Sequence, residues 1–214
     1  PGSSMRFLEK SRSLAVDSIA YDLEDSVTIN KKPEARENIL TILNRDRVAG
    51  IREQAVRINS VSSGFALQDL TTVLRGTHLD AIVVPKVDRP SDLHFITDVL
   101  RQTLPERHAP GSTNPVKIIA LIESARSVTD LNAICTSSPY ISGLTFAAED
   151  FALDLSITRT PDLHEFTYAR SAIVTAARAF EIPSALDLVS TTFRGEEGTK
   201  ALRAESENGR RFGF

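Results

Sequence analysis

Short apolar runs that end in acidic or other polar residues recur along this chain, and segments with the helical spacing of apolar residues separate them. The predicted strands are residues 18–25, 54–59, 81–86, 117–122, 143–148 and 185–190. The predicted helices are residues 5–15, 32–43, 66–74, 91–104, 127–136, 162–180 and 198–209. This alternation predicts successive βα units and a parallel sheet.

Polar side chains stand at or near the C-terminal ends of almost all the predicted strands. They are Asp22, Asp25, Arg57, Asn59, Lys86, Glu123, Asp150 and Asp187. A (β/α)8 barrel gathers such ends around one mouth, whereas an open doubly wound sheet concentrates them at one switch point. The chain has no Gly-x-Gly-x-x-Gly or phosphate-loop lysine motif that would support nucleotide binding. We therefore predict an α/β fold of the TIM-barrel type.

The predicted barrel is incomplete. A TIM barrel has eight strands and usually about 250 residues, whereas this chain has 214 residues and shows only the six strands given above. It opens with Pro1-Gly2 ahead of a helix and closes with residues 209–214 after a helix. We therefore expect one domain over residues 1–214 that lacks barrel strands 1 and 8.

The composition is that of an ordinary globular domain, with 41% hydrophobic and 25% charged residues. The net charge of −3 does not favour nucleic acid or an anionic membrane as a partner. The single cysteine, Cys135, excludes an intrachain disulfide, and we expect it in the core. No apolar run reaches the roughly 18 residues of a membrane helix, and no signal peptide is visible. We expect an intracellular protein, cytoplasmic or mitochondrial.

Glu123 and Asp150 each follow an apolar run, and two such carboxylates on neighbouring strands would suit a hard cation. Mg²⁺ prefers oxygen ligands and keeps several waters, so one or two carboxylates are enough. The alternative is that these acids belong to the first turns of helices, where they stabilise the helix by about 0.5–2 kcal/mol. Glu149 is expected to be a solvated or supporting acid beside them.

Arg57 lies in an apolar strand, where a charge without a partner is costly. We expect Asp25 or Glu24 to pair with Arg57 or Lys32, or to organise metal-bound water, because three acids, Asp22 included, would crowd one strand end. The four histidines are expected on the surface, away from the strand ends. They are His78, His94, His108 and His164.

Several segments of the chain match a known family in order and spacing. They are Pro1–Lys10, Asp22–Val27 with Lys32 and Ala35–Asn38, Val56–Asn59, Val84–Lys86, Leu121–Arg126, Gly143–Asp154, Tyr168–Ser171 and Ala185–Asp187. At these positions the chain resembles the HpcH/HpaI aldolase and citrate lyase superfamily, in its citrate lyase beta-subunit-like branch.

The resemblance implies a TIM barrel that assembles into trimers or hexamers. It implies a Mg²⁺-dependent enzyme that cleaves or forms carbon–carbon bonds in 3-hydroxyacyl-CoA thioesters such as citryl-, malyl- or citramalyl-CoA. It makes Glu123 and Asp150 the metal ligands, and it makes Arg57 the residue that holds a substrate carboxylate or thioester carbonyl. It places Arg6 and Lys10 near the CoA phosphates.

We assign Asp25 to catalysis together with Arg57. The acids and the lysine expected to support these residues are Asp22, Glu24, Lys32, Glu149 and Asp187. The Ile-His-Pro motif of the family's last strand and the C-terminal segment that supplies a catalytic acid in many members are absent from this sequence. Two alternatives therefore stay open: an aldolase acting on a free 2-oxo acid, and a non-catalytic subunit that binds a ligand or partners.

Overall fold

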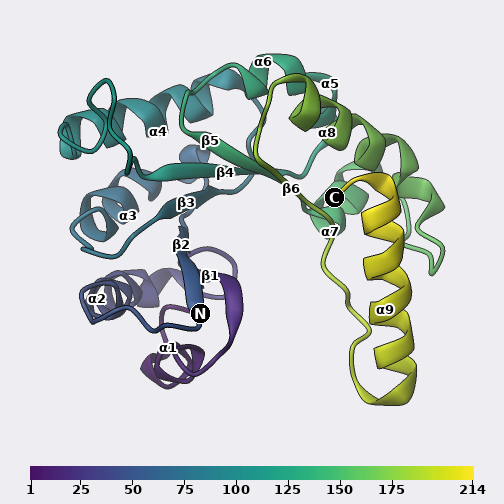
Figure 1. The fold of residues 1–214 in the computed structure, drawn as a ribbon, viewed down its shortest axis with the longest axis horizontal. Helices are drawn as coiled ribbons and strands as arrows, with labels where there is room; N and C mark the ends of the chain where they lie inside the picture. Colours follow the sequence, from purple (N-terminus) through teal and green to yellow (C-terminus); the bar gives the residue numbers. More distant parts are fainter. The chain divides into compact units, whose positions relative to one another are not determined.

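The computed structural model of the chain describes all residues from Pro1 to Phe214. The strands are β1 (Val16–Asp22), β2 (Ile51–Arg57), β3 (Ala81–Val84), β4 (Lys117–Ile122), β5 (Ile141–Phe146) and β6 (Ser184–Leu186). The α-helices are α1 (Met5–Ser11), α2 (Lys32–Leu43), α3 (Ala66–Val73), α4 (Pro90–Thr103), α5 (Ala125–Thr129), α6 (Leu131–Cys135), α7 (Ala148–Leu155), α8 (Thr167–Ala179) and α9 (Gly195–Phe212), as Figure 1 shows. The 3-10 helices are η1 (Ile29–Lys31), η2 (Val61–Ser63) and η3 (His164–Phe166). The strands follow the chain order, from β1 to β6, in one six-stranded sheet.

The chain divides into two compact units, and the first comprises Pro1–Pro85 and Ser91–Ile119. In this unit β1 pairs in parallel with β2, and β2 pairs in parallel with β3. All four residues of β3 are buried, as expected for a parallel strand that is covered on both faces. The parallel pairing brings the C-terminal ends of these strands to one edge of the sheet.

The helix α2 shows why the local sequence folds as it does in the first unit. Pro33 stands in its first turn, where the missing backbone N–H costs no hydrogen bond. Ala35, Ile39 and Leu43 recur at intervals of four residues, and all three side chains are fully buried. Burying a leucine or isoleucine side chain stabilises a fold by about 1.5–3 kcal/mol, so this face holds α2 in the unit.

The second unit comprises Lys86–Pro90 and Ala120–Phe214. In it β5 pairs in parallel with β6, with Thr145 opposite Leu186. Three aromatic side chains, Phe146, Phe151 and Phe166, form the centre of its core. Their rings pack edge to face with centroid distances of 5.3, 5.5 and 6.3 Å, in the range that favours such pairs.

The six predicted strands and their alternation with helices are confirmed, consistent with part of a TIM barrel. The bounds predicted for α2 and β4 agree with the structure at both ends. The single helix predicted over residues 127–136 is wrong. Ser124 caps a helix that already begins at Ala125, and Asp130 leaves the helical conformation (φ −112°, ψ 19°) between α5 and α6.

Further differences lie in the second unit. The predicted strand over residues 143–148 ends at Phe146, and the unpredicted helix α7 begins at Ala148. The helix predicted from residue 162 starts only at Thr167, because Leu163 adopts the left-handed conformation (φ 57°). β6 has three residues, fewer than the predicted 185–190, and α9 extends beyond the predicted 198–209 at both ends. No helix of the chain combines the length and the apolar character that crossing a membrane requires.

Candidate active site

One arginine and three acids gather at the C-terminal ends of β1 and β2 in the first unit. We call Asp22, Glu24, Asp25 and Arg57 the Arg57 cluster. Arg57 ends β2 opposite Asp22 in β1, and its Nε donates to Asp22 Oδ1 at 2.6 Å. Arg57 Nη1 lies 3.0 Å from Glu24 Oε2 and 3.6 Å from Asp25 Oδ2. The expected pairing of Arg57 with Glu24 or Asp25 is confirmed, and Asp22 is a third partner.

The charges of the Arg57 cluster stabilise one another. Burial opposes ionisation of Asp22, but hydrogen bonds from Arg57 and Ser26 outweigh it and hold the pKa of Asp22 well below its usual range. Burial also opposes the charge of Arg57, but Asp22, followed by Glu24 and Asp25, raises its pKa. Arg57 therefore stays cationic, and its side chain, 27% exposed, can be reached by an anionic ligand.

A chain of buried polar side chains lies beside the Arg57 cluster. Lys32 Nζ donates to the carbonyl oxygen of Leu23 at 2.8 Å and to Asn59 Oδ1 at 2.6 Å. Asn59 Nδ2 donates to Asp69 Oδ2 at 2.6 Å, and Arg36 Nε donates to Asp69 Oδ1 at 2.7 Å. Asp69 is fully buried and Lys32, Arg36 and Asn59 are nearly so, and this chain links α2 and α3 to the loops that follow β1 and β2.

Lys32 is among the residues predicted to support the site, whereas Arg36 and Asp69 are not. Lys32 and Arg36 are four residues apart on α2, on the face that also buries Ala35 and Ile39. Charged side chains on an otherwise apolar helical face need buried partners. The four-residue spacing of Lys32 and Arg36 on this face could therefore have predicted that both are buried and paired.

In the second unit, Glu123 and the first turn of α7 are neighbours. Glu123 directly follows β4, and it is 5% exposed. The backbone N–H of Ala147 donates to the carbonyl oxygen of Ile122 at 3.1 Å, which joins the chain ahead of α7 to the end of β4. Glu123 comes directly after Ile122, and Asp150 comes three residues after Ala147. Both acids therefore follow residues that are hydrogen-bonded to each other at one edge of the sheet.

Asp150 does not end a strand, as the predicted strand over residues 143–148 implied. It lies in the first turn of α7, beside Glu149. A carboxylate in this position also stabilises the helix through its dipole, by roughly 0.3–1 kcal/mol. The helical placement that we had considered for Asp150 is therefore correct, and it does not prevent the carboxylate from binding a cation.

The candidate metal donors in the second unit are the carboxylates of Glu123 and Asp150. No group of three or more His, Cys, Asp or Glu side chains is arranged to hold a metal ion. Glu123 and Asp150 offer hard carboxylate oxygens, and Mg²⁺ takes one or two of these and completes its octahedron with water and substrate oxygens. These two residues could hold such an ion.

Glu149 and Asp187 have partners other than a metal. Glu149 Oε1 accepts a hydrogen bond from Arg159 Nη1 at 2.6 Å. Asp187 pairs with Arg170, which is 1% exposed, at 2.5 Å. Arg170 also donates to Asn208 on α9 at 2.7 Å, so Asp187 belongs to a contact that holds α9 to α8.

Arg6 and Lys10 lie four residues apart on α1, and both are exposed. Their assignment to CoA binding stays a prediction. The expectation of surface histidines is wrong for His108, which is 8% exposed, with its Nδ1 3.0 Å from the carbonyl oxygen of Leu104. Cys135 is buried as expected, and burial raises the pKa of its thiol to about 11, which disfavours the nucleophilic thiolate form.

A family model for HpcH/HpaI aldolase/citrate lyase matches residues 1–214. The chain belongs to this family. Mitochondrial citramalyl-CoA lyase of Rattus norvegicus is 34% identical over 223 residues, which cover 100% of this chain and 64% of the relative. Citrate lyase subunit beta of Haemophilus influenzae is 34% identical over 202 residues, which cover 92% of this chain and 66% of the relative.

A solved structure of this family has a similar fold. Protein CitE from Mycobacterium tuberculosis, in complex with magnesium and acetoacetate, is 27% identical and has a TM-score of 0.75 over 100% of this chain and 80% of that chain. The resemblance to the HpcH/HpaI aldolase/citrate lyase family is thus confirmed. The chain spans slightly less than two thirds of the length of the two curated relatives.

Proposed function

We propose that this protein is a Mg²⁺-dependent carbon–carbon lyase, or the reverse condensing enzyme, that acts on a 3-hydroxyacyl-CoA such as citryl-, malyl- or citramalyl-CoA. The observation that carries the proposal is the family match over residues 1–214, whose relatives include proteins named citramalyl-CoA lyase and citrate lyase subunit beta. Glu123 and Asp150 support it, because they offer the oxygen ligands that Mg²⁺ prefers.

In the cleavage direction, a base removes the proton of the substrate's 3-hydroxyl group. The bond between C2 and C3 then breaks, C3 becomes the carbonyl carbon of the released oxo compound, and the electron pair stays on the acyl-CoA as an enolate. A proton added to the enolate carbon completes the acyl-CoA product. Mg²⁺ would supply Lewis-acid polarisation of the developing carbonyl, with Glu123 and Asp150 holding the ion.

In this proposal Arg57 binds a substrate carboxylate or the thioester oxygen. Its planar guanidinium suits either group, and hydrogen-bond donors at a developing oxyanion lower the barrier. Asp25 acts as the base because its side chain is 60% exposed. Asp22 is unsuited to that role, since its carboxylate already accepts hydrogen bonds from Arg57 and Ser26 and its pKa is far below its usual range.

The decisive experiment offers the purified chain a panel of 3-hydroxyacyl-CoA thioesters and the matching free hydroxy acids, with and without Mg²⁺. We expect Mg²⁺-dependent release of an oxo acid from at least one thioester, and loss of this release in Glu123→Ala. Cleavage of free acids alone would replace the proposal by a 2-oxo acid aldolase. Absence of any turnover by a folded, Mg²⁺-binding chain would favour the non-catalytic subunit.

Two further properties belong to the same proposal. We propose a homo-oligomer, a trimer or a hexamer, which sedimentation velocity would measure directly. We also propose an intracellular site of action, cytoplasmic or mitochondrial, and the relative from Rattus norvegicus is named as mitochondrial. Imaging of the tagged protein in its source cells would test the compartment.

A further inference from the structure

Arg159 joins three segments of the second unit through one guanidinium group. Its Nη1 donates to Glu149 Oε1 in α7 at 2.6 Å and to the carbonyl oxygen of Val189 at 3.1 Å. Its Nη2 donates to Glu205 Oε1 in α9 at 3.2 Å. The side chain of Arg159 is only 15% exposed, and that of Glu205 only 21%. The planar guanidinium of an arginine loses little side-chain freedom for each hydrogen bond that it forms, so these three bonds favour a single orientation of Arg159.

The contact bears on the metal because Glu149 is adjacent to Asp150 in the first turn of α7. Two carboxylates in sequence compete for one cation, and successive helical residues point about 100° apart. The charge-assisted hydrogen bond from Arg159 points the side chain of Glu149 toward Arg159. This bond also orients the first turn of α7, which carries Asp150. It also neutralises the acid that would otherwise compete as a ligand.

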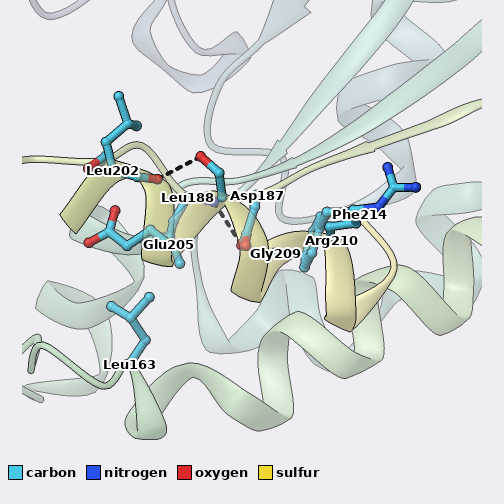
Figure 2. Close-up of a pocket in the computed structure, with 10 residues that line it drawn as sticks. Leu163, Asp187, Leu188, Leu202, Glu205, Gly209, Arg210 and Phe214 are labelled. Carbon is cyan, nitrogen blue, oxygen red and sulfur yellow. Dashed lines mark hydrogen bonds between the residues drawn. The ribbon is translucent and has the colours of Figure 1, made fainter. Parts of the chain in front are cut away.

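On α9, the charge of Glu205 is also balanced by Arg159. Glu205 lines a cavity of about 250 Å³ together with Leu163 and Leu202, as Figure 2 shows. Its second carboxylate oxygen, Oε2, is buried without a hydrogen-bond partner. Arg159 pairs with this carboxylate at its other oxygen, Oε1, at 3.2 Å. Loss of Arg159 would leave a largely buried charge uncompensated.

We propose that Arg159 is a positioning residue for the metal, one that holds Glu149 aside, fixes the turn carrying Asp150, and couples this turn to α9. The inference rests on the proposed function, in which Glu123 and Asp150 bind Mg²⁺. It assigns to α9, a helix with no residue among the metal ligands, an influence on metal affinity through Glu205.

Two simpler roles for Arg159 give different results. If Arg159 acted only as a nearby positive charge, its removal would tighten Mg²⁺ binding, because a cation repels a cation. If it only stabilised the fold, its removal would lower the melting temperature and leave the Mg²⁺ affinity of the folded protein unchanged. Positioning predicts weaker binding in a protein that remains folded.

The test is Mg²⁺ titration by isothermal calorimetry on the wild type, Arg159→Met, Arg159→Lys and Glu205→Gln, with melting temperatures measured in parallel. Substitution of residues that orient metal ligands typically lowers the affinity for the metal 10–100-fold. We expect Arg159→Met to weaken Mg²⁺ binding by about tenfold or more. Arg159→Lys should lose less, because lysine keeps the charge but lacks the fork. Glu205→Gln should lose a few-fold.

Two exposed residues of α9 provide matched controls. Glu197→Gln removes the same charge as Glu205→Gln from a side chain that is 85% exposed, and Arg203→Met removes an exposed arginine. Both should leave the affinity within about twofold of the wild type, as expected for surface changes. If Arg159→Met does not fold, Arg159→Lys and Glu205→Gln decide the question.

Unchanged or tighter Mg²⁺ binding in the folded Arg159 and Glu205 variants would overturn the positioning role. Failure of the proposed function looks different, because then the wild type would not bind Mg²⁺, or Glu123→Ala and Asp150→Ala would bind it as the wild type does. If those two variants lose binding while Arg159→Met and Glu205→Gln keep it, only the inference about Arg159 falls.

Discussion

Arg57 shows how one residue depends on its neighbours in the fold. A half-buried guanidinium is unfavourable by itself, and here three carboxylates from the end of β1 and the loop after it surround one side of the group. Asp22 receives the shortest contact from Arg57, at 2.6 Å. In the proposed function Asp22 orients the arginine, and Asp25, which is more exposed, acts as the base.

The first prediction concerns substrate binding by Arg57. Arg57→Met should lower kcat/KM for the best thioester by about 100-fold or more, because it removes the donors for a carboxylate or oxyanion. Arg57→Lys should retain part of the activity, since the charge stays and the fork is lost. Steady-state kinetics measures both. Arg52→Met, on the same strand but 85% exposed, is the control and should behave as the wild type.

The second prediction is a pH dependence of stability that comes from Asp22. The folded-state pKa of Asp22 lies below its ordinary value of 3.8, so the unfolded chain takes up the proton first as pH falls. The stability that ionised Asp22 contributes is therefore complete well above pH 3.8 and is lost as the pH falls below it. Urea unfolding between pH 3 and pH 7 should show the wild type losing more stability than Asp22→Asn in this acidic range. Parallel curves for the two proteins would contradict the prediction.

At the scale of elements, buried polar contacts decide how the helices are held. In the first unit Asp69 on α3 joins Arg36 on α2 and Asn59 after β2. In the second unit Arg170 on α8 joins Asp187 after β6 and stacks on Phe212 of α9, 4.1 Å from the ring centre. Both are buried ion pairs, whose disruption from one side leaves a charge that water cannot reach.

The third prediction tests the contact between α2 and α3. Asp69→Asn should lower the free energy of unfolding by about 3 kcal/mol, because it leaves the buried charge of Arg36 without its counterion. Chemical denaturation measures this change. Glu34→Gln, also on α2, removes an exposed ion pair with Lys31 of η1, and it should change stability by less than about 0.5 kcal/mol. Equal effects of the two substitutions would show that burial of the pair does not matter.

The fourth prediction concerns the attachment of α9. Arg170→Met should speed amide hydrogen exchange across Gly195–Phe212, because α9 loses the bond to Asn208 and the stacking on Phe212. Exchange in α2 of the first unit should stay unchanged. Lys200→Met, at an exposed position of α9, is the control. Unaltered exchange in α9 of the Arg170 variant would mean that other contacts hold this helix.

At the scale of the whole molecule, the family match runs through both compact units and carries the proposed chemistry. The ends of β1 and β2 carry the Arg57 cluster, and the end of β4 and the start of α7 carry the candidate metal ligands. Each group lies at or shortly after the C-terminal ends of strands, where TIM barrels place their active residues. A ligand that binds only the folded chain must then stabilise the whole molecule.

The fifth prediction is this stabilisation by Mg²⁺. At an ion concentration 100 times the dissociation constant, binding adds about 2.7 kcal/mol to the free energy of unfolding, which raises the melting temperature. We expect this increase in thermal shift measurements on the wild type and its loss in Glu123→Ala. Glu53→Ala, at a partly exposed acid of β2, serves as the control for a general effect of removing an acid. An equal shift in Glu123→Ala would place the ion elsewhere.

Much of the fold could be predicted because its causes are local. The repeated apolar runs predict the six strands, and the spacing of Ala35, Ile39 and Leu43 predicts α2 with both of its ends. The resemblance carried by strand-end motifs identified the family, which the comparisons confirm. Helix boundaries that depend on the conformation of a single residue were not predicted. At Leu163 the left-handed φ delays the start of α8, which had been predicted from residue 162.

The alternation of strands and helices, the family, and the acids and the arginine on which the proposed chemistry depends could all be inferred from the amino-acid sequence. The pairing of these charges, in contrast, depends on how the chain folds in three dimensions. Arg36 and Asp69, Arg159 and Glu205, and Arg170 and Asn208 are separated by 33, 46 and 38 residues along the chain. The spacing of apolar residues predicts which face of a helix or strand is buried. The partner of a buried charge depends instead on which distant segments pack together in the fold.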